Sequence, residues 1–248
     1  MANSTIIFKQ MGHIAYITLN RPEKENVLTP EMGQELAELS TKINGEESIW
    51  LIVVKAQGVT FCSGSEIPAD LSMKMSPASA LAAINRPTLA VINGDAIGSG
   101  LELALACDLR LASENAKFAL PQIKEGHIPA DGGTQRLSRL VGKGKAMEII
   151  LTGEIIDARE ALEIGLINKS VKAAELDPEA ETLAATLVSK APLATRYCKE
   201  AVMKGLDQTL EQGLRLEADL YFLLHTTEDR SEGVKSFLEK RKAEYKGK

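Results

Sequence analysis

The sequence predicts an α/β domain followed by a helical region, and two patterns support this fold class. Up to about Ser170, short and wholly apolar runs alternate with segments of helical periodicity. From Asp177 onward, apolar residues recur only at helical spacing. With 248 residues, 44% of them hydrophobic, the chain is long enough to bury a sizeable core. We therefore predict an α/β core over residues 1–190 and a helical region over residues 191–248.

The individual elements follow from local patterns. The first helix should be capped by the Thr29 side chain, begin at Pro30 and end at Gly45, because apolar residues repeat at helical spacing between these points. A buried helix is expected over Leu101–Ala106, and Pro192 should begin a helix in the C-terminal region. The predicted strands share short apolar runs, and the first two should pair as a hairpin; they are Ile6–Phe8, Ile14–Leu19, Trp50–Val54, Leu89–Ile92 and Leu109–Leu111.

Composition and charge argue against several classes of protein. The formal net charge of −5 disfavours general nucleic-acid binding, which needs a basic surface. The three cysteines, Cys62, Cys107 and Cys198, form no C-x-x-C pair, so neither a zinc site nor a disulfide framework is expected. Residues 1–5 lack a signal-peptide pattern, and no apolar run reaches the roughly 18 residues of a membrane span. We therefore expect a protein of the reducing cytoplasm without a membrane partner.

The segment Asn93–Ala104 carries the strongest chemical signal. An apolar strand leads into a turn that contains Gly98 and Gly100, and an apolar helix follows. Glycines let a ligand approach the backbone, and the first N–H groups of a helix have no partner inside it, so this helix start can bind an anion or a developing oxyanion. A second interpretation stays open, because Ser99 and Glu102 have the spacing of a capping box that merely satisfies the helix start.

Two further segments are rich in small or polar residues. Thr60–Ile67 follows a predicted strand and is by itself only a small-residue turn. Phe118–Leu137 contains His127 and Asp131, and Asp131 precedes an expected helix, which is the position of an N-cap. The chain has only three histidines, which leaves little material for a metal cluster or a Ser-His-Asp triad. No metal site is therefore expected.

Taken together, these segments resemble the crotonase, or enoyl-CoA hydratase/isomerase, superfamily over nearly the whole chain. The motifs that carry the resemblance occur in the order typical of that family; they are Leu19–Pro22, Phe61–Ile67, Gly98–Asp108, Phe118–Leu137, Leu151–Gly153, Ala158–Leu166 and Glu232–Arg241. The resemblance implies a core of ββα repeats wound into a spiral, and a C-terminal helical region that builds homotrimers, often paired into hexamers. It also implies an acyl-coenzyme A thioester as substrate and no separate cofactor, because coenzyme A is carried by the substrate.

The resemblance assigns binding roles to individual residues. The family's oxyanion hole consists of two backbone N–H groups, and the matching positions are Ser65 and Ser99. The other residues expected to contact the substrate lie beside these two or in the following motif; they are Ser63, Gly64, Glu66, Ile67, Gly98, Gly100 and Gln122. Lys24, Phe237 and Lys240 are expected to contact coenzyme A, the latter two as candidates from a neighbouring subunit, although Lys240 also fits a merely solvated basic run.

The catalytic positions include one departure from the family pattern. Hydratases of the family use two glutamates as acid and base, and the first of them matches Glu102. The second matches Gln122, whose amide cannot exchange a proton near neutral pH. Asp131 falls close to a carboxylate that dienoyl-CoA isomerases of the family use, so we predict Glu102 and Asp131 as a catalytic pair beside the α and β carbons. The alternative is that Asp131 is only a cap and Glu102 acts alone, with Gln122 orienting water or the acyl chain.

These expectations combine into one mechanism with rivals that stay open. The N–H groups of Ser65 and Ser99 stabilise the thioester enolate, and Glu102 moves a proton, so an enoyl-CoA is hydrated, formed by dehydration, or isomerised. The same oxyanion hole could serve decarboxylation or thioester hydrolysis, and the loss of the second glutamate favours these rivals. A protein that binds acyl-CoA without turnover is a third possibility, although a buried Glu102 would then need another partner.

Overall fold

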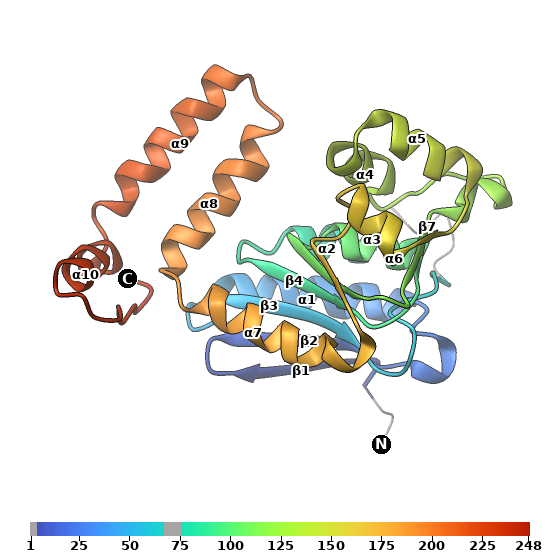
Figure 1. The fold of residues 1–248 in the computed structure, drawn as a ribbon, viewed down its shortest axis with the longest axis horizontal. Coiled ribbons are helices and arrows are strands. Elements are labelled where there is room, and N and C mark those ends of the chain that lie inside the picture. The colour runs from blue at the N-terminus through green and yellow to red at the C-terminus, as the bar shows by residue number, and fades with distance from the viewer. Residues whose placement is uncertain (1–3, 67–75) are drawn as a thin grey trace.

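The computed structural model describes residues 4–66 and 76–248, and its core is a six-stranded sheet (Figure 1). The strands lie in the order β1-β2-β3-β4-β6-β9, and their bounds are Ile6–Met11, Ile14–Leu19, Leu51–Ala56, Thr88–Ile92, Leu109–Ser113 and Lys169–Val171. β1 and β2 pair antiparallel, which confirms the predicted hairpin, and all other neighbours pair parallel. The strands predicted from apolar runs all belong to this sheet.

A second, three-stranded sheet is made of β5 Ala96–Ile97, β7 Lys117–Ala119 and β8 Ile156–Asp157. The chain alternates between the two sheets, since β4 of the large sheet is followed by β5, and β6 is followed by β7. A single bridge between Cys62 and Ala96 brings the segment after β3 alongside β5. Each turn of the chain therefore contributes a strand to both sheets before helical structure follows, which is a ββα spiral.

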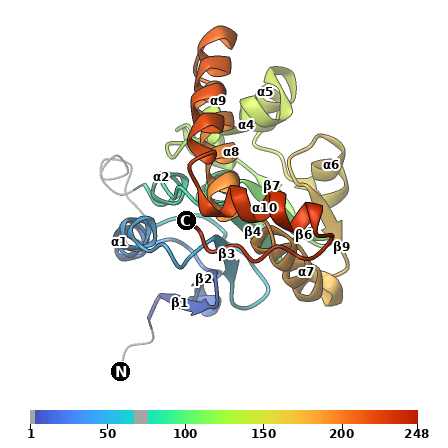
Figure 2. The same ribbon diagram turned by 90° about the vertical axis from the view of Figure 1, so that its left-hand side faces the viewer.

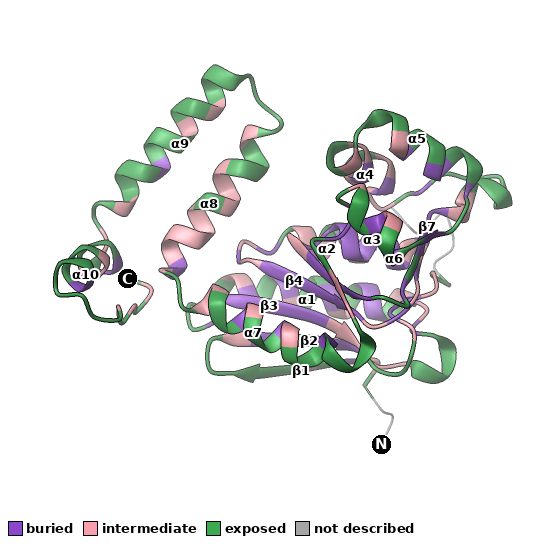
Figure 3. Ribbon diagram, viewed as in Figure 1, coloured by how far each residue is buried: buried purple, intermediate pink, exposed green. Residues whose placement is uncertain are grey.

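The large sheet is covered on both faces, which explains why the first four residues of β3, Leu51 to Val54, are all apolar. Ile52 and Val54 belong to the main core, whereas Leu51 and Val53 pack in a second cluster against α7 Leu176–Val188. Successive side chains of a strand point to opposite faces, so a strand buried on both sides needs apolar residues at every position. Figure 3 shows this central burial in β3 and β4.

Helices fill the connections between strands. The first, α1, begins at Pro30, and the Thr29 side chain accepts a hydrogen bond from the Met32 N–H, so the predicted cap is confirmed. The bounds of α1 to α6 are Pro30–Gly45, Pro77–Ala82, Ser99–Leu105, Gly133–Val141, Lys143–Thr152 and Ala158–Glu163. Within residues 4–66 and 76–248, no helix combines the length and apolarity that crossing a membrane would take.

The C-terminal helices α8 Pro192–Gly205 and α9 Leu210–Leu224 form a hairpin that stands away from the sheets, and α10 Glu228–Leu238 runs across its base (Figures 1 and 2). The break expected at residue 190 falls in the link between α7 and α8. Lys199 holds α8 to the core, because its ammonium lies 2.8 Å from the Asp108 carboxylate. Figure 3 shows that α9 and α10 are largely exposed. Their exposed residues include large apolar side chains, such as those of Leu210, Phe222 and Phe237, and exposed apolar surface is typical of interfaces.

Candidate active site

The candidate site lies where β5 ends and α3 begins. The Ile97 N–H donates to the Cys62 carbonyl at 2.9 Å, so the segment after β3 runs directly beside β5. Gly98 turns the chain into α3 with a φ of +56°. A Cβ on Gly100 would lie 2.1 Å from the Cys62 carbonyl oxygen, so only glycine lets α3 start this close to the neighbouring backbone. Two segments far apart in the sequence therefore meet at one point.

Two backbone N–H groups lie at this junction without acceptors. Leu28 forms a parallel bridge with Ser65. The Leu28 N–H donates to the Gly64 carbonyl at 3.0 Å, and the Leu28 carbonyl accepts from the Glu66 N–H at 2.8 Å. The Ser65 N–H therefore points away from Leu28, because N–H groups alternate in direction along an extended chain. Ser99 is the first residue of α3, so its N–H has no acceptor inside the helix. In the part of the chain that the structure describes, neither N–H has an acceptor.

The same two residues show that the capping-box interpretation of α3 is wrong. The N-cap of α3 is Gly98, which has no side chain to offer. The Ser99 hydroxyl instead donates to the Ser65 hydroxyl at 3.0 Å. The Glu102 carboxylate is bound by a different segment of the chain and not by its own helix start. The contact between the hydroxyls holds the two oxyanion-hole candidates side by side.

Glu102 is buried in the first turn of α3, with 2% of its surface exposed. Its Oε1 accepts hydrogen bonds from the N–H groups of Asp131, at 2.7 Å, and Gly133, at 2.9 Å. Burial is the main cause that raises the pKa of Glu102 above its ordinary value; the two N–H bonds and the Arg136 charge oppose the rise, and the Asp131 charge adds to it. A buried carboxyl with a raised pKa is suited to taking up and releasing a proton near neutral pH.

Gln122 lies between Glu102 and the turn at Gly98. It belongs to the short 3-10 helix Pro121–Glu125, and its Nε2 donates to Glu102 Oε2 at 3.4 Å. The same amide nitrogen would lie 3.7 Å from a Cβ on Gly98. Its Oε1 is buried and has no hydrogen-bond partner among the residues that the structure describes, which leaves it able to accept from a donor on a substrate or on water.

Asp131 does not cap the helix that follows it, and its carboxylate is bound by another segment of the chain. The N-cap of α4 is Gly132, so the expectation that Asp131 caps the helix that follows it is wrong. Its carboxylate accepts hydrogen bonds from Ala78 and Ser79, at the start of α2. The backbone of Asp131, and not its side chain, contacts Glu102. Catalysis by the Asp131 carboxylate stays a prediction, and these contacts do not support it.

The other predicted substrate contacts gather around the two serines. Ser63, Gly64 and Glu66 adjoin Ser65, and Gly98 and Gly100 adjoin Ser99; the prediction for Ile67 lies outside the described residues. Lys24 ends the exposed 3-10 helix Pro22–Lys24. This helix is tied to the site segment, because the Ser63 N–H donates to the Glu25 carbonyl at 3.1 Å. The Lys24 backbone is therefore one residue away from a direct contact with the segment that carries Ser65.

Phe237 and Lys240 lie at the far end of the molecule from this site. Both belong to α10 or its end, and Figure 1 places α10 on the opposite side of the molecule from α3. Phe237 is 81% exposed. The two side chains therefore do not contribute to the site of their own chain, and a role in coenzyme A binding requires a second copy of the chain.

Sequence reasoning missed two residues that shape the site. A Cβ on Gly133 would lie 3.0 Å from Glu102 Oε1, so a side chain there would displace the carboxylate. Asn26 is fully buried, and its side-chain NH₂ donates to the carbonyls of Gln57 and Thr60, both at 2.8 Å. It therefore fixes the start of the segment that carries Ser65. The adjacent glycines Gly132 and Gly133 could have indicated a close backbone approach in the sequence. A single polar residue such as Asn26 shows no pattern that would indicate its structural role.

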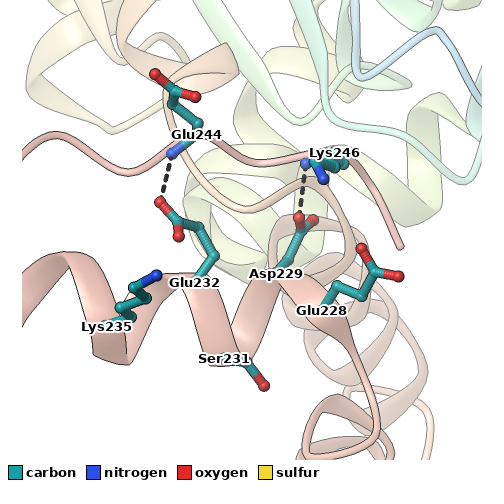
Figure 4. A pocket seen from close by; sticks show the side chains of 7 residues that line it. All are labelled: Glu228, Asp229, Ser231, Glu232, Lys235, Glu244 and Lys246. Carbon is teal, nitrogen blue, oxygen red and sulfur yellow. Dashed lines mark hydrogen bonds between the residues drawn. The ribbon is translucent and has the colours of Figure 1, made fainter.

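A separate pocket lies beside α10, lined by Glu228, Asp229, Ser231, Glu232, Lys235, Glu244 and Lys246 (Figure 4). Its two central carboxylates already have partners. Asp229 accepts the Lys246 N–H at 2.6 Å, and Glu232 accepts the Glu244 N–H at 2.9 Å. Hydrogen bonding from Arg241, followed by the Glu244 bond, lowers the pKa of Glu232 to about 2. These contacts dock the C-terminal tail onto α10, so we assign this pocket no catalytic role.

Comparisons with known proteins identify the family to which the chain belongs. A model of the enoyl-CoA hydratase/isomerase family matches residues 9–248. The chain belongs to the enoyl-CoA hydratase/isomerase family. The resemblance that the sequence motifs indicated is thereby confirmed, and at the level of the family the chain is an enzyme of acyl-CoA thioester hydration or isomerisation.

Relatives of this enoyl-CoA hydratase/isomerase family member differ in the acyl groups that their names indicate. A crotonyl-CoA hydratase of Syntrophomonas wolfei is 36% identical over 99% of both chains. An (E)-benzylidenesuccinyl-CoA hydratase of Thauera aromatica is 38% identical over 95% of this chain and 96% of the relative. The crystal structure of an enoyl-CoA hydratase from Bacillus anthracis has a TM-score of 0.94 at 35% identity and covers 99% of this chain and 100% of its own. The predicted fold class is therefore confirmed.

Proposed function

We propose that this chain binds an acyl-CoA thioester and stabilises its enolate between the backbone N–H groups of Ser65 and Ser99. One observation carries the proposal: in the described structure, two N–H groups without acceptors meet beside a buried carboxyl, that of Glu102. Donors that are already in place need no rearrangement when charge develops on the thioester oxygen. Removal of one such donor typically raises the barrier by about 3 kcal/mol.

Glu102 moves the proton in this proposal. Two backbone N–H bonds fix its Oε1, so Oε2, whose bond from Gln122 is 3.4 Å long, is the atom assigned to proton transfer. As a carboxylate, Oε2 removes a proton beside the thioester carbonyl, and the C–H electron pair moves onto the thioester oxygen. The protonated Glu102 then returns the proton to another carbon, which moves the double bond, or assists the departure of a β-hydroxyl as water.

Gln122 limits how these outcomes can be reached. The family's usual pair of glutamates is not available here, because the Gln122 amide cannot exchange a proton. Its buried Oε1 can still accept a hydrogen bond from a water or a β-hydroxyl, while its Nε2 contacts Glu102. We infer that Glu102 acts as the one proton carrier, for hydration or dehydration with an oriented water, or for double-bond migration. Neither reaction requires a metal or a redox cofactor.

We further propose that the active form is a homotrimer or a pair of trimers in the cytoplasm. Two observations support an assembly: α9 and α10 expose large apolar side chains, and Phe237 and Lys240 can reach an active site only across an interface. Lys24, Phe237 and Lys240 would then provide contacts to coenzyme A. Sedimentation analysis with and without an acyl-CoA tests this, and a monomer that turns over substrate at full rate would contradict it.

The deciding experiment measures turnover of enoyl-, dienoyl- and malonyl-type CoA esters in H₂¹⁸O by mass spectrometry, with Glu102→Gln as the matched variant. Gln keeps an acceptor oxygen for the Asp131 and Gly133 N–H groups but cannot carry a proton, so activity should fall by about 10²- to 10⁴-fold. Hydration places ¹⁸O on the β carbon, and isomerisation leaves the product mass unchanged.

The rival functions give different results in the same experiment. Loss of CO₂ from a malonyl-type ester identifies a decarboxylase, and release of free coenzyme A identifies a thioester hydrolase. Tight binding of the esters without any product identifies a binding protein. Full activity of Glu102→Gln would show that this carboxyl does not carry the proton.

A further inference from the structure

Asp131 is held at its side chain and at its backbone. The Ala78 N–H donates to Oδ2 at 2.6 Å, while the Ser79 N–H and hydroxyl donate to Oδ1 at 3.1 and 2.7 Å. The Arg136 guanidinium donates to the Asp131 carbonyl at 2.6 Å. The geometry of the Asp131 carboxylate is that of a structural acceptor at the start of α2.

The remaining polar group of Asp131 is its N–H, and it holds the carboxyl that the proposed function relies on. This N–H donates to Glu102 Oε1 at 2.7 Å, the shortest of the hydrogen bonds to that carboxyl. Helix α2 also packs on α3, the helix that carries Glu102. Asp131 therefore connects α3 and α2 a second time: its N–H binds Glu102 of α3, and its carboxylate binds the start of α2.

We propose that Asp131 is a positioning residue for Glu102 and not a second proton carrier. The hydrogen bonds from α2 to the Asp131 carboxylate fix the orientation of the Asp131 peptide, and the N–H of this peptide donates to Glu102 Oε1. This inference rests on the proposed function of Glu102 and replaces the catalytic pair that the sequence predicted. A carboxyl that drifts by about 1 Å from its reacting geometry can lose about 10²-fold in rate. The orientation of the Asp131 peptide thus controls the rate without contact with the substrate.

Asp131→Asn and Asp131→Ala distinguish the two roles in the full-length assembled protein. Asn keeps one acceptor oxygen for α2, and its NH₂ can donate to the Ser79 hydroxyl, but it cannot exchange a proton. A positioning role predicts that kcat of the Asn variant stays within about tenfold of the parent, while the Ala variant loses about 10²-fold with little change in KM. Equal losses of about 10²- to 10⁴-fold in both variants would identify a proton carrier and overturn the proposal.

A double-mutant cycle with Ser79→Ala tests whether the effect runs through α2. Ser79→Ala removes one of the three bonds to the Asp131 carboxylate and should lower kcat of the parent by a smaller factor than Asp131→Ala. In the Asp131→Ala background it should cause no further loss, because the contact is already gone. Independent losses that multiply in the double variant would overturn the proposal.

Hydrogen–deuterium exchange provides a readout that needs no substrate. In Asp131→Ala, the amides of residues 131–133 should exchange at least about tenfold faster, and Asn should restore protection, while α5 serves as an unchanged internal reference. If the parent turns over no thioester but exchange responds in this way, the proposed function fails and the positioning role stands. If exchange and kcat are both unchanged in Asp131→Ala, the positioning role is refuted.

Discussion

Gly100→Ala should damage the proposed oxyanion hole by separating the two segments that supply its N–H groups. An added Cβ would lie 2.1 Å from the Cys62 carbonyl oxygen, whereas ordinary contacts begin at 3.4 Å, so α3 and the Cys62 backbone must move apart by about 1.3 Å. Both partners are backbone, so no side chain can yield. Because α3 carries the Ser99 N–H and the Cys62 segment leads to the Ser65 N–H, the movement separates the two donors.

The size of the effect follows from this displacement. A misplacement of about 1 Å costs about 10²-fold, so kcat/KM should fall by at least that factor. Overpacking should cost about 1–3 kcal/mol of stability, which lowers Tm by about 2–4 °C for each kcal/mol in a chain of this size. Both quantities are measured on purified protein, by a continuous assay of enoyl-CoA absorbance and by calorimetry.

The matched control is Gly144→Ala, in α5. A Cβ there would meet nothing within 4 Å, so activity should stay at the parental value and stability should rise by about 0.5–1 kcal/mol. A folded Gly100→Ala variant with parental kcat/KM would refute the reasoning, because the spacing of the two N–H groups would then not limit the reaction.

Three further predictions follow from individual contacts. Burial raises the pKa of Glu102 above 4.5, so the stability that its protonated form contributes is lost as pH rises through the folded pKa. The Tm of Glu102→Gln minus the Tm of the parent should therefore increase from mildly acidic to mildly alkaline buffer. A Tm difference that stays constant over this range would contradict the prediction. Gln122→Glu adds a carboxyl beside Glu102 and should increase ¹⁸O incorporation at the β carbon by about tenfold if water is delivered there; no increase would place Gln122 outside that step. Asp229→Ala removes the acceptor of the Lys246 and Gly247 N–H groups, at 2.6 and 2.9 Å, and should make the C-terminal tail sensitive to protease, whereas Lys246→Ala keeps its N–H and should not.

Local patterns predicted the large sheet well and the small sheet poorly. The strands β1 to β4 and β6 each contain apolar residues in a run or in alternation, and these patterns are long enough to indicate a strand. β5 and β8 have two residues each, which is too short for any periodicity to appear. They are strands only because the spiral brings partners alongside them, as Ala96 pairs with Phe118.

The functional site shows the same division. Ser99 and Glu102 fit a capping box by spacing alone, and the sequence offered no reason to reject it. The structure rejects it because Asp131 and Gly133 bring two N–H groups to the buried Glu102 carboxylate from a distant segment. A carboxylate at a capping-box position can bind any donor that the fold brings near it, so the spacing alone does not establish a capping box.

The sequence by itself determined the α/β class, the family, and the one chemically decisive substitution, Gln122 in place of a second glutamate, because apolar periodicity, motif order and residue type are local properties. Only the tertiary structure decided which groups meet: the Ser99 hydroxyl with the Ser65 hydroxyl, and the Asp131 carboxylate with α2, 53 residues earlier in the chain. Such contacts depend on how buried donors and acceptors satisfy one another across the whole core, and no window of the sequence contains that information.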